Sequence, residues 1–172
     1  MPRVHHWIGR GYIASAVVMS VSGLYLSWFR DGVGSVVMKT GGSLNALLIL
    51  LCAAMAVRYA MARKLDAHRR WALRLFLVVS GVWFFRLGLM SWLIVNGGPA
   101  GFDPGTFRGP FLNVLSYSQT LVPLTVLEFY LRAQAHSGSG AKFAVASGIL
   151  VCTGVTALGI VGVTMMMWLP RL

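Results

Sequence analysis

Five apolar runs divide the chain, and each is long enough to form a helix that crosses a lipid bilayer. A helix needs about 20 mostly apolar residues to cross about 30 Å of hydrocarbon. Together the runs predict an all-α integral membrane bundle, built as a single transmembrane domain over residues 1–172. The predicted spans cover about residues 7–29, 43–62, 71–96, 111–131 and 143–168.

Polar and turn-forming segments separate the five runs. Glycine and charged residues fill positions 30–42, which we expect to form a loop. Residues 63–70 (RKLDAHRR) are the densest basic cluster of the chain, and residues 97–110 are rich in turn formers. Residues 134–142 have the composition of a flexible linker. This alternation of long apolar runs and short polar segments is typical of a multi-pass membrane protein.

The first apolar run could also belong to a signal peptide, since Arg3 and Arg10 precede most of it. Its apolar part is too long for such a peptide, however, and it lacks a clear A-x-A cleavage site. We therefore expect an uncleaved first span.

The composition agrees with a membrane protein and disfavours a soluble one. The chain is 57% hydrophobic and 11% charged, with a mean hydropathy of +0.73. A soluble domain of this length could not bury so many apolar residues in one core. The net charge of +11 could suggest nucleic-acid binding. The basic residues lie between apolar spans, where they fix membrane orientation, so no nucleic-acid partner is expected.

The distribution of Lys and Arg predicts that the N-terminus is cytoplasmic and the C-terminus is outside. Arg86 lies within a span, and four other cations would be outside: Arg30, Lys39, Arg108 and Arg171. Ten would be inside: Arg3, Arg10, Arg58, Arg63, Lys64, Arg69, Arg70, Arg74, Arg132 and Lys142. Five tryptophans fall near span ends, as an aromatic belt requires: Trp7, Trp28, Trp71, Trp92 and Trp168.

The last two predicted spans carry features of helix packing. Pro123 should kink the fourth span, which is also the most polar of the five. The fifth span repeats small residues every four positions, which allows two helix backbones to approach closely. This repeat would serve either a homodimer or packing within one chain, and it consists of Ala144, Gly148, Cys152 and Thr156.

Two similar segments open the first and third spans, and both carry histidine and arginine. VHHWIGRGY places His5, Gly9 and Tyr12 on one helical stripe, and His6 and Arg10 on another. AHRRWALRLF makes His68 and Trp71 neighbours three residues apart, and Arg70 and Arg74 neighbours four residues apart. Free N–H groups at both helix starts would add to the positive charge on the cytoplasmic side.

Two charged residues lie inside the later spans. Glu128 lies about 17 residues into the fourth span, roughly 25 Å along the helix, and would need a partner such as Arg10 or Arg74, or a proton. Arg86 lies about 15 residues into the third span, roughly 23 Å from the inner face. It would bind an anion or lipid head group, or brace the spans through the polar side chains Asn113, Ser116, Tyr117, Ser118 and Gln119.

These residues resemble a bacterial membrane protein family catalogued as domain of unknown function 2306. The resemblance rests on H-x-x-x-G-R-x-Y (His5, Gly9, Arg10, Tyr12) and on H-R-x-W-x-x-R (His68, Arg69, Trp71, Arg74). Arg86 and Glu128 also fall where the family typically has these residue types, so the likeness covers about residues 5–132. It implies the bacterial cytoplasmic membrane and a helical fold, but no activity. Family members often carry further helices before the first His motif, which leaves open a short form or a start further upstream.

The sequence favours a binding protein with a transport or sensing role. A small anionic ligand or lipid head group would bind a cytoplasmic cluster of His5, Arg10, Tyr12, His68, Trp71, Arg74, Arg86 and Glu128. In the simpler alternative, the basic residues serve only topology and contact with anionic lipids, each contributing about 1 kcal/mol.

Two other functions stay open. His5 and His68 could ligate a haem b for electron transfer, although both lie at helix ends. The other is a membrane enzyme acting on a lipid: the chain contains neither H-E-x-x-H nor G-x-S-x-G, which leaves a His–carboxylate acid/base pair as its possible chemistry. There is no Cys/His cluster with zinc spacing, so no metal is expected. Apart from the haem alternative, no cofactor is predicted.

Overall fold

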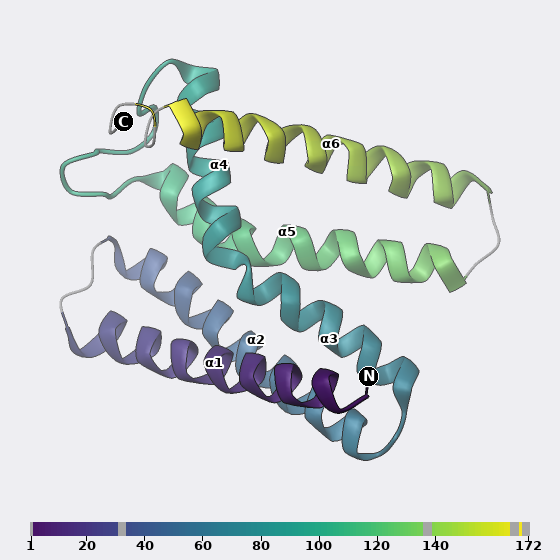
Figure 1. Cartoon of the computed structure of the whole chain (residues 1–172). Helices are drawn as coiled ribbons and strands as arrows, with labels where there is room; N and C mark the ends of the chain where they lie inside the picture. Colours follow the sequence, from purple (N-terminus) through teal and green to yellow (C-terminus); the bar gives the residue numbers. More distant parts are fainter. Residues whose placement is uncertain (1, 31–33, 136–138, 166–168, 170–172) are drawn as a thin grey trace. The chain divides into compact units, whose positions relative to one another are not determined.

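The computed structural model describes residues 2–30, 34–135, 139–165 and 169, and in these ranges it contains helices and turns but no β-strand (Figure 1). This confirms the all-helical fold class. The six helices are α1 (Pro2–Phe29), α2 (Val36–Met61), α3 (Leu65–Val79), α4 (Gly81–Asn96), α5 (Pro110–Ala135) and α6 (Ser139–Val163). They divide into two compact units, unit 1 (Met1–Val79) and unit 2 (Ser80–Leu172), which are described separately.

Three helices of the described chain are long and apolar enough to cross a membrane. They cover Val4–Phe29, Val36–Met61 and Val145–Val163, and α3 and α4 add a fourth span if they are counted as one broken helix. Helix α5 stays below this limit because polar residues such as Asn113, Ser118 and Gln119 interrupt its apolar surface. The protein is therefore a multi-pass membrane protein with three to four clearly apolar spans, close to the five predicted.

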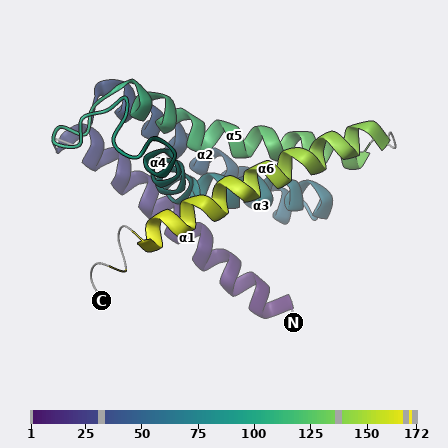
Figure 2. The ribbon, with the colours of Figure 1, turned by 90° about the horizontal axis from the view of Figure 1, so that it is seen from above.

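In unit 1, α2 packs against both α1 and α3 (Figure 2). The buried stripe of α2 consists largely of small residues, including Cys52, Ala53 and Ala56. In α1, Ala16 and Ser20 are also buried, and the Trp28 indole N–H donates a hydrogen bond to the Ser43 hydroxyl of α2 at 2.8 Å. Small side chains let helix backbones approach closely, and van der Waals packing then holds membrane helices together.

Two helix boundaries correct the sequence prediction. Residues 30–42 were expected to form a loop, but α2 begins at Val36, and the side chain of Ser35 accepts a hydrogen bond from the Met38 N–H at 3.2 Å. Gly41 and Gly42 therefore lie inside the helix, as glycine often does in membrane helices. The predicted third span is broken at Ser80 between α3 and α4, since a Ser-Gly pair is a common site for a helix break.

In unit 2, α4 packs against both α5 and α6. A Cβ on Gly159 of α6 would lie 2.7 Å from the Leu87 carbonyl oxygen, so only glycine fits there. Ser91 also donates a hydrogen bond to the Val155 carbonyl oxygen at 3.1 Å. The face of α6 that packs on α4 therefore includes Val155, Gly159 and Gly162. Gly148 of the predicted small-residue repeat faces open space, and the Ala144 side chain lies outside the described residues.

The loop between α4 and α5 is ordered by aromatic packing. The Trp92 indole lies 4.4 Å from the Phe111 ring between centroids and donates a hydrogen bond to the Ala100 carbonyl oxygen at 2.8 Å. Phe102 and Phe107 pack on one another in the loop, with centroids 6.3 Å apart. The turn-rich composition of 97–110 thus corresponds to a structured loop.

The remaining predictions for this half concern helix ends and Pro123. Helix α5 runs through Pro123 without ending. The predicted linker is shorter than its composition suggested, because α5 extends to Ala135 and α6 begins at Ser139. Trp168, at the predicted end of the fifth span, lies outside the described residues.

Candidate functional site

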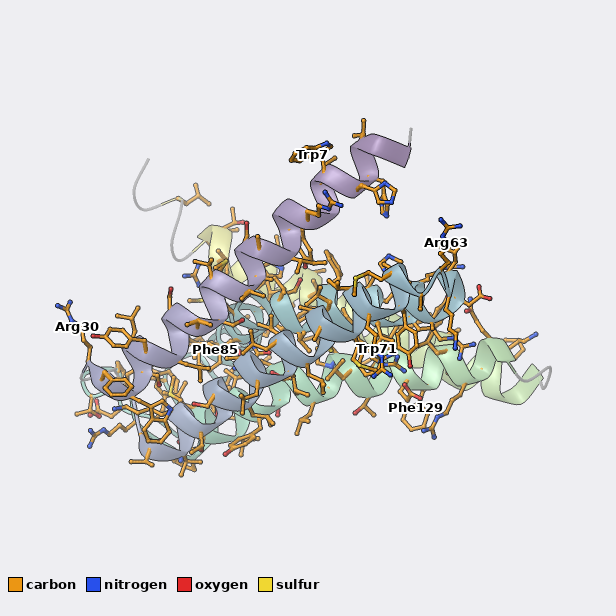
Figure 3. The ribbon with its side chains drawn as sticks, turned by 90° about the horizontal axis from the view of Figure 1, so that it is seen from below. Trp7, Arg30, Arg63, Trp71, Phe85 and Phe129 are labelled. Atoms are coloured by element: carbon orange, nitrogen blue, oxygen red, sulfur yellow. The ribbon has the colours of Figure 1, made fainter. Side chains whose placement is uncertain are left out.

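One end of unit 1 collects most of its positive charge, and we call it the basic end. It comprises the start of α1, the end of α2, the turn at 62–64 and the start of α3. Figure 3 shows Trp7 and Arg63 at this end and Arg30 at the other. The cationic side chains that the structure describes there are Arg10, Arg58, Arg63, Lys64, Arg69, Arg70 and Arg74.

Arg63 holds an unusual backbone conformation at the end of α2. Its φ of 55° is left-handed. The N–H of Arg63 donates a hydrogen bond to the Ala60 carbonyl oxygen, and the N–H of Lys64 donates one to the Tyr59 carbonyl oxygen. These two hydrogen bonds define a Schellman motif, in which the left-handed position is usually glycine. A non-glycine residue there costs about 1–2 kcal/mol. The end of α2 therefore carries a cation at a position where the backbone favours glycine.

His68 is held in the contact between α3 and α2. Its Nδ1 lies 2.9 Å from the carbonyl oxygen of Ala56, and the ring is half-buried. Because a carbonyl can only accept, Nδ1 must carry the hydrogen. The other ring nitrogen, Nε2, has no hydrogen-bond partner in the described chain. The contact fixes both the tautomer and the direction of the ring.

Trp71 and Arg74 form the second fixed pair on α3. The guanidinium carbon of Arg74 lies 5.0 Å from the centroid of the Trp71 ring, within the range of a cation–π contact. Both side chains are partly buried. Successive positions of a helix are 100° apart, so His68 and Arg74 fall on opposite sides of Trp71. The structure thus places three of the predicted site residues side by side along α3.

The three predicted site residues of α1 are placed differently. His5, Arg10 and Tyr12 are exposed, and in the described residues none of them forms a hydrogen bond or ion pair. The His5 ring has the ring of His6 as a neighbour, with centroids 6.2 Å apart. The α1 residues share the basic end with α3, but in the described residues no hydrogen bond, ion pair or ring contact joins them to the row of His68, Trp71 and Arg74.

Six cations of the basic end have no partner within the described part of the chain. They are exposed, and their side chains make no hydrogen bond or ion pair there: Arg10, Arg58, Arg63, Lys64, Arg69 and Arg70. The one described carboxylate of unit 1, Asp66, opens α3 and bonds none of them. Their charge is therefore left for water, ions or lipids to neutralise.

The other two predicted site residues, Arg86 and Glu128, belong to unit 2. The carboxylate of Glu128 accepts a hydrogen bond from Nε of Arg132, one turn later on α5, at 3.3 Å. Arg86 is exposed and makes no hydrogen bond or ion pair with any described residue. Of the two roles considered for Arg86, the brace to the polar residues of α5 has no hydrogen bond or ion pair behind it in the described chain. Ser116 and Gln119 bond to carbonyls of their own helix instead.

Sequence reasoning missed two features of the basic end. The left-handed Arg63 could not be predicted, because helix-end rules expect glycine at that position. The contact between His68 and Ala56 depends on how α2 and α3 align, which residue spacing along one helix does not reveal. The cluster RKLDAHRR was the available signal, and it did locate the turn.

Comparison with known proteins identifies a family of membrane proteins. A family model described as "Predicted membrane protein (DUF2306)" matches residues 1–103. The match includes unit 1 and all of α4, whereas Glu128 lies beyond it. No curated protein and no solved structure matches the chain. Because the match covers more than half of its length, the chain belongs to the DUF2306 family of predicted membrane proteins.

Proposed function

We propose that the basic end of unit 1 binds the phosphate of an anionic lipid head group or of a small phosphate-bearing anion. The protein would use this site in a transport or sensing role at the cytoplasmic face of a bacterial inner membrane. The site residues would be His68, Trp71 and Arg74 on α3, with His5, Arg10 and Tyr12 on α1 at its edge.

The observation that carries the proposal is the left-handed Arg63 among unpartnered cations. A strained backbone conformation is retained at a non-glycine residue when its side chain is needed, and such residues cluster at functional sites. Glycine would end α2 without strain, yet it would remove a positive charge. Asp66 bonds none of the neighbouring cations. An anion from outside the chain would satisfy them.

The row of His68, Trp71 and Arg74 on α3 adds groups of fixed orientation to these cations. Stacking on Trp71 restricts the guanidinium of Arg74, so less side-chain freedom would be lost when it binds a phosphate. The Nε2 of His68 could accept a hydrogen bond from a monoprotonated phosphate or, once protonated, donate one. Tryptophan also favours the head-group level of a bilayer. These features suit a phosphate at the membrane surface.

The proposal can be tested by native mass spectrometry of the purified protein released from detergent. The probes are phosphatidylglycerol, phosphatidylcholine and inorganic diphosphate. The variant Arg10→Gln/Arg74→Gln removes two charges at the basic end. The control Arg30→Gln/Lys39→Gln removes two charges at the opposite end of unit 1.

We expect phosphatidylglycerol to be retained over phosphatidylcholine, and retention to fall roughly 10- to 30-fold in the basic-end variant, at about 1 kcal/mol per cation. The control should retain the lipid. If diphosphate displaces phosphatidylglycerol, the site recognises phosphate itself; if it does not, the site needs the lipid. Equal losses in both variants would leave only non-specific attraction and overturn the proposal.

A second candidate is a haem b bound by His5 and His68, and the tautomer of His68 favours it. Histidines that ligate metals usually donate their other ring N–H to a carbonyl or carboxylate, as Nδ1 of His68 does to Ala56. His5 is exposed and makes no described contact with His68. The purified protein should then show a Soret band that is lost in His68→Leu. A spectrum without that band under haem-supplemented expression would reject the candidate.

A further inference from the structure

Arg86 is a charged residue on an apolar, exposed face of α4. Val82, one turn before it, is 59% exposed, and Trp83 is 45% exposed. These three side chains are neighbours on the helix surface, because residues three and four apart lie on one face. Arg86 forms no hydrogen bond or ion pair in the described chain. We call this surface the Arg86 face.

The Arg86 face is not one of the faces that unit 2 uses for its own packing. Leu87, the next residue, contacts Gly159 of α6, and Gly88 contacts Leu115 of α5. Each residue turns a helix by 100°, so Arg86 lies about 100° from the contact with α6 and about 200° from that with α5. The packing of α4 in its unit therefore leaves Arg86 outside.

The guanidinium of Arg86 lies too deep to reach a lipid phosphate easily. The interface at the loop end of α4 is marked by Trp92, six residues later, or about 9 Å along the helix. Side chains on a helix lean toward its N-terminus, which takes the guanidinium away from that interface. A cation at such a depth is costly unless it meets a polar or charged partner within the membrane.

The carboxylates of unit 2 do not fill this role. Glu128 is bonded by Arg132, and Asp103 accepts hydrogen bonds from the Gly105 N–H and the Thr106 hydroxyl in the loop. Glu128 also lies about 27 Å along α5 from its loop end, whereas Arg86 lies about 16 Å along α4 from the same loop. The mismatch disfavours Glu128 of a second copy as well. In unit 1, Asp66 belongs to the basic end, and Asp31 lies outside the described residues.

We propose that the Arg86 face binds a transmembrane helix of another membrane protein, and that this helix carries an Asp or Glu paired with Arg86. Val82 and Trp83 would supply the apolar contact around the ion pair. Removing one member of a buried ion pair leaves the other charge unpaired, which is strongly unfavourable. The ion pair would therefore select the partner helix and set its register against α4. This interaction is independent of anion binding at the basic end.

The test places a photo-crosslinking amino acid at Val82 in the full chain, in its native membrane. The control position is Leu150 on α6, which is 72% exposed. We expect an adduct from Val82 whose partner peptide is a transmembrane segment containing Asp or Glu. Arg86→Gln should reduce its yield at least roughly tenfold, while Arg86→Lys keeps the cation and most of the yield. Any adduct at Leu150 should not change.

Reversing both charges completes the experiment. Arg86→Glu should lose the adduct, and replacing the partner's carboxylate with Arg should restore it. If Arg86→Gln is lost from the membrane, neutralising the partner's carboxylate must remove the adduct instead. The proposal is overturned by no adduct, by adducts with lipid only or with a second copy, or by a partner segment without a carboxylate. A yield that does not depend on charge would also overturn it.

Discussion

The ends of α2 and α4 close with the same hydrogen bonds but with different residues. Both form a Schellman motif with a left-handed residue, which is Arg63 (φ 55°) in unit 1 and Gly97 (φ 64°) in unit 2. Glycine adopts this conformation without a steric penalty, whereas arginine does not. The difference shows that α2 ends at some cost to backbone stability while keeping a cation. The basic end is thus less optimised for folding than its counterpart.

The two units also differ in charge balance, and the excess of cations is larger in unit 1. Unit 1 has ten Lys and Arg residues against two acidic ones, whereas unit 2 has five against two. In unit 2 both carboxylates are engaged, Glu128 by Arg132 and Asp103 by its own turn. In unit 1 the described carboxylate, Asp66, bonds none of the surrounding cations. Unit 1 therefore presents charge to its surroundings, whereas unit 2 satisfies its carboxylates within the chain.

The largest effect is expected from Gly159→Ala, which tests whether α4 and α6 are closely packed in unit 2. Gly159→Ala would place a Cβ 2.7 Å from the Leu87 carbonyl oxygen, which forces α4 and α6 apart. We expect the free energy of unfolding to fall by about 1–3 kcal/mol. Gly148→Ala is the matched control, because its Cβ meets open space. Thermal unfolding in detergent, followed by circular dichroism, would measure both, and equal effects would contradict the close packing.

A smaller effect is expected in the aromatic loop of unit 2. Trp92→Phe removes the hydrogen bond to the Ala100 carbonyl and should cost about 0.5–1.5 kcal/mol. Trp83→Phe, on the exposed face of the same helix, should cost less. The same unfolding measurement compares the two variants. A larger loss from Trp83→Phe would mean that the loop does not depend on this contact.

Arg63→Gly tests the strained end of α2 directly. Relief of the left-handed strain should outweigh the extra backbone freedom of glycine in the unfolded chain, with a net gain of at most about 1 kcal/mol. The variant should bind phosphatidylglycerol roughly fivefold more weakly, since one cation is lost. Arg69→Gly loses a cation too, but from within α3, and should be less stable. Destabilisation of both variants would show that Arg63 is not strained.

The smallest effect concerns the Asp103 turn. The Thr106 hydroxyl and the Gly105 N–H stabilise the carboxylate and lower its pKa below the ordinary value of 3.8. Because the folded pKa is depressed, the stabilisation is fully present above the unfolded pKa and is lost as the pH falls through the folded pKa. Thr106→Val should raise the pKa of Asp103. An NMR titration of Asp103 would detect the change, and an unchanged midpoint would contradict it.

The sequence located the helices well but not their ends. Long apolar runs identify membrane helices because the bilayer requires each span to satisfy its own backbone hydrogen bonds. The start of α2 was missed because Gly41 and Gly42 suggested a loop, whereas Ser35 caps a helix that continues through them. The break at Ser80 was missed because its flanking residues are as apolar as the helix interior.

The candidate site was predictable only in part. Helical spacing places Trp71 on the same helix face as His68, whereas the contact between Arg74 and Trp71 comes from the structure. No hydrogen bond or ion pair joins Arg86 to α5 in the described chain, and short polar side chains such as Ser116 bond to their own backbone instead. The support of His68 by Ala56 depends on packing between two helices. Such contacts depend on register, which a hydrophobic pattern specifies only loosely.

The most direct test of the basic end is to map where a phosphate-bearing lipid touches the chain. A phosphatidylglycerol analogue with a photoreactive head group can be crosslinked to the protein in membranes, and the labelled peptides identified by mass spectrometry. We predict that most label falls within residues 58–74, around Arg63 and Arg70. Label concentrated at 30–43 or 97–110, or spread evenly over both units, would contradict the assignment of the anion site to the basic end.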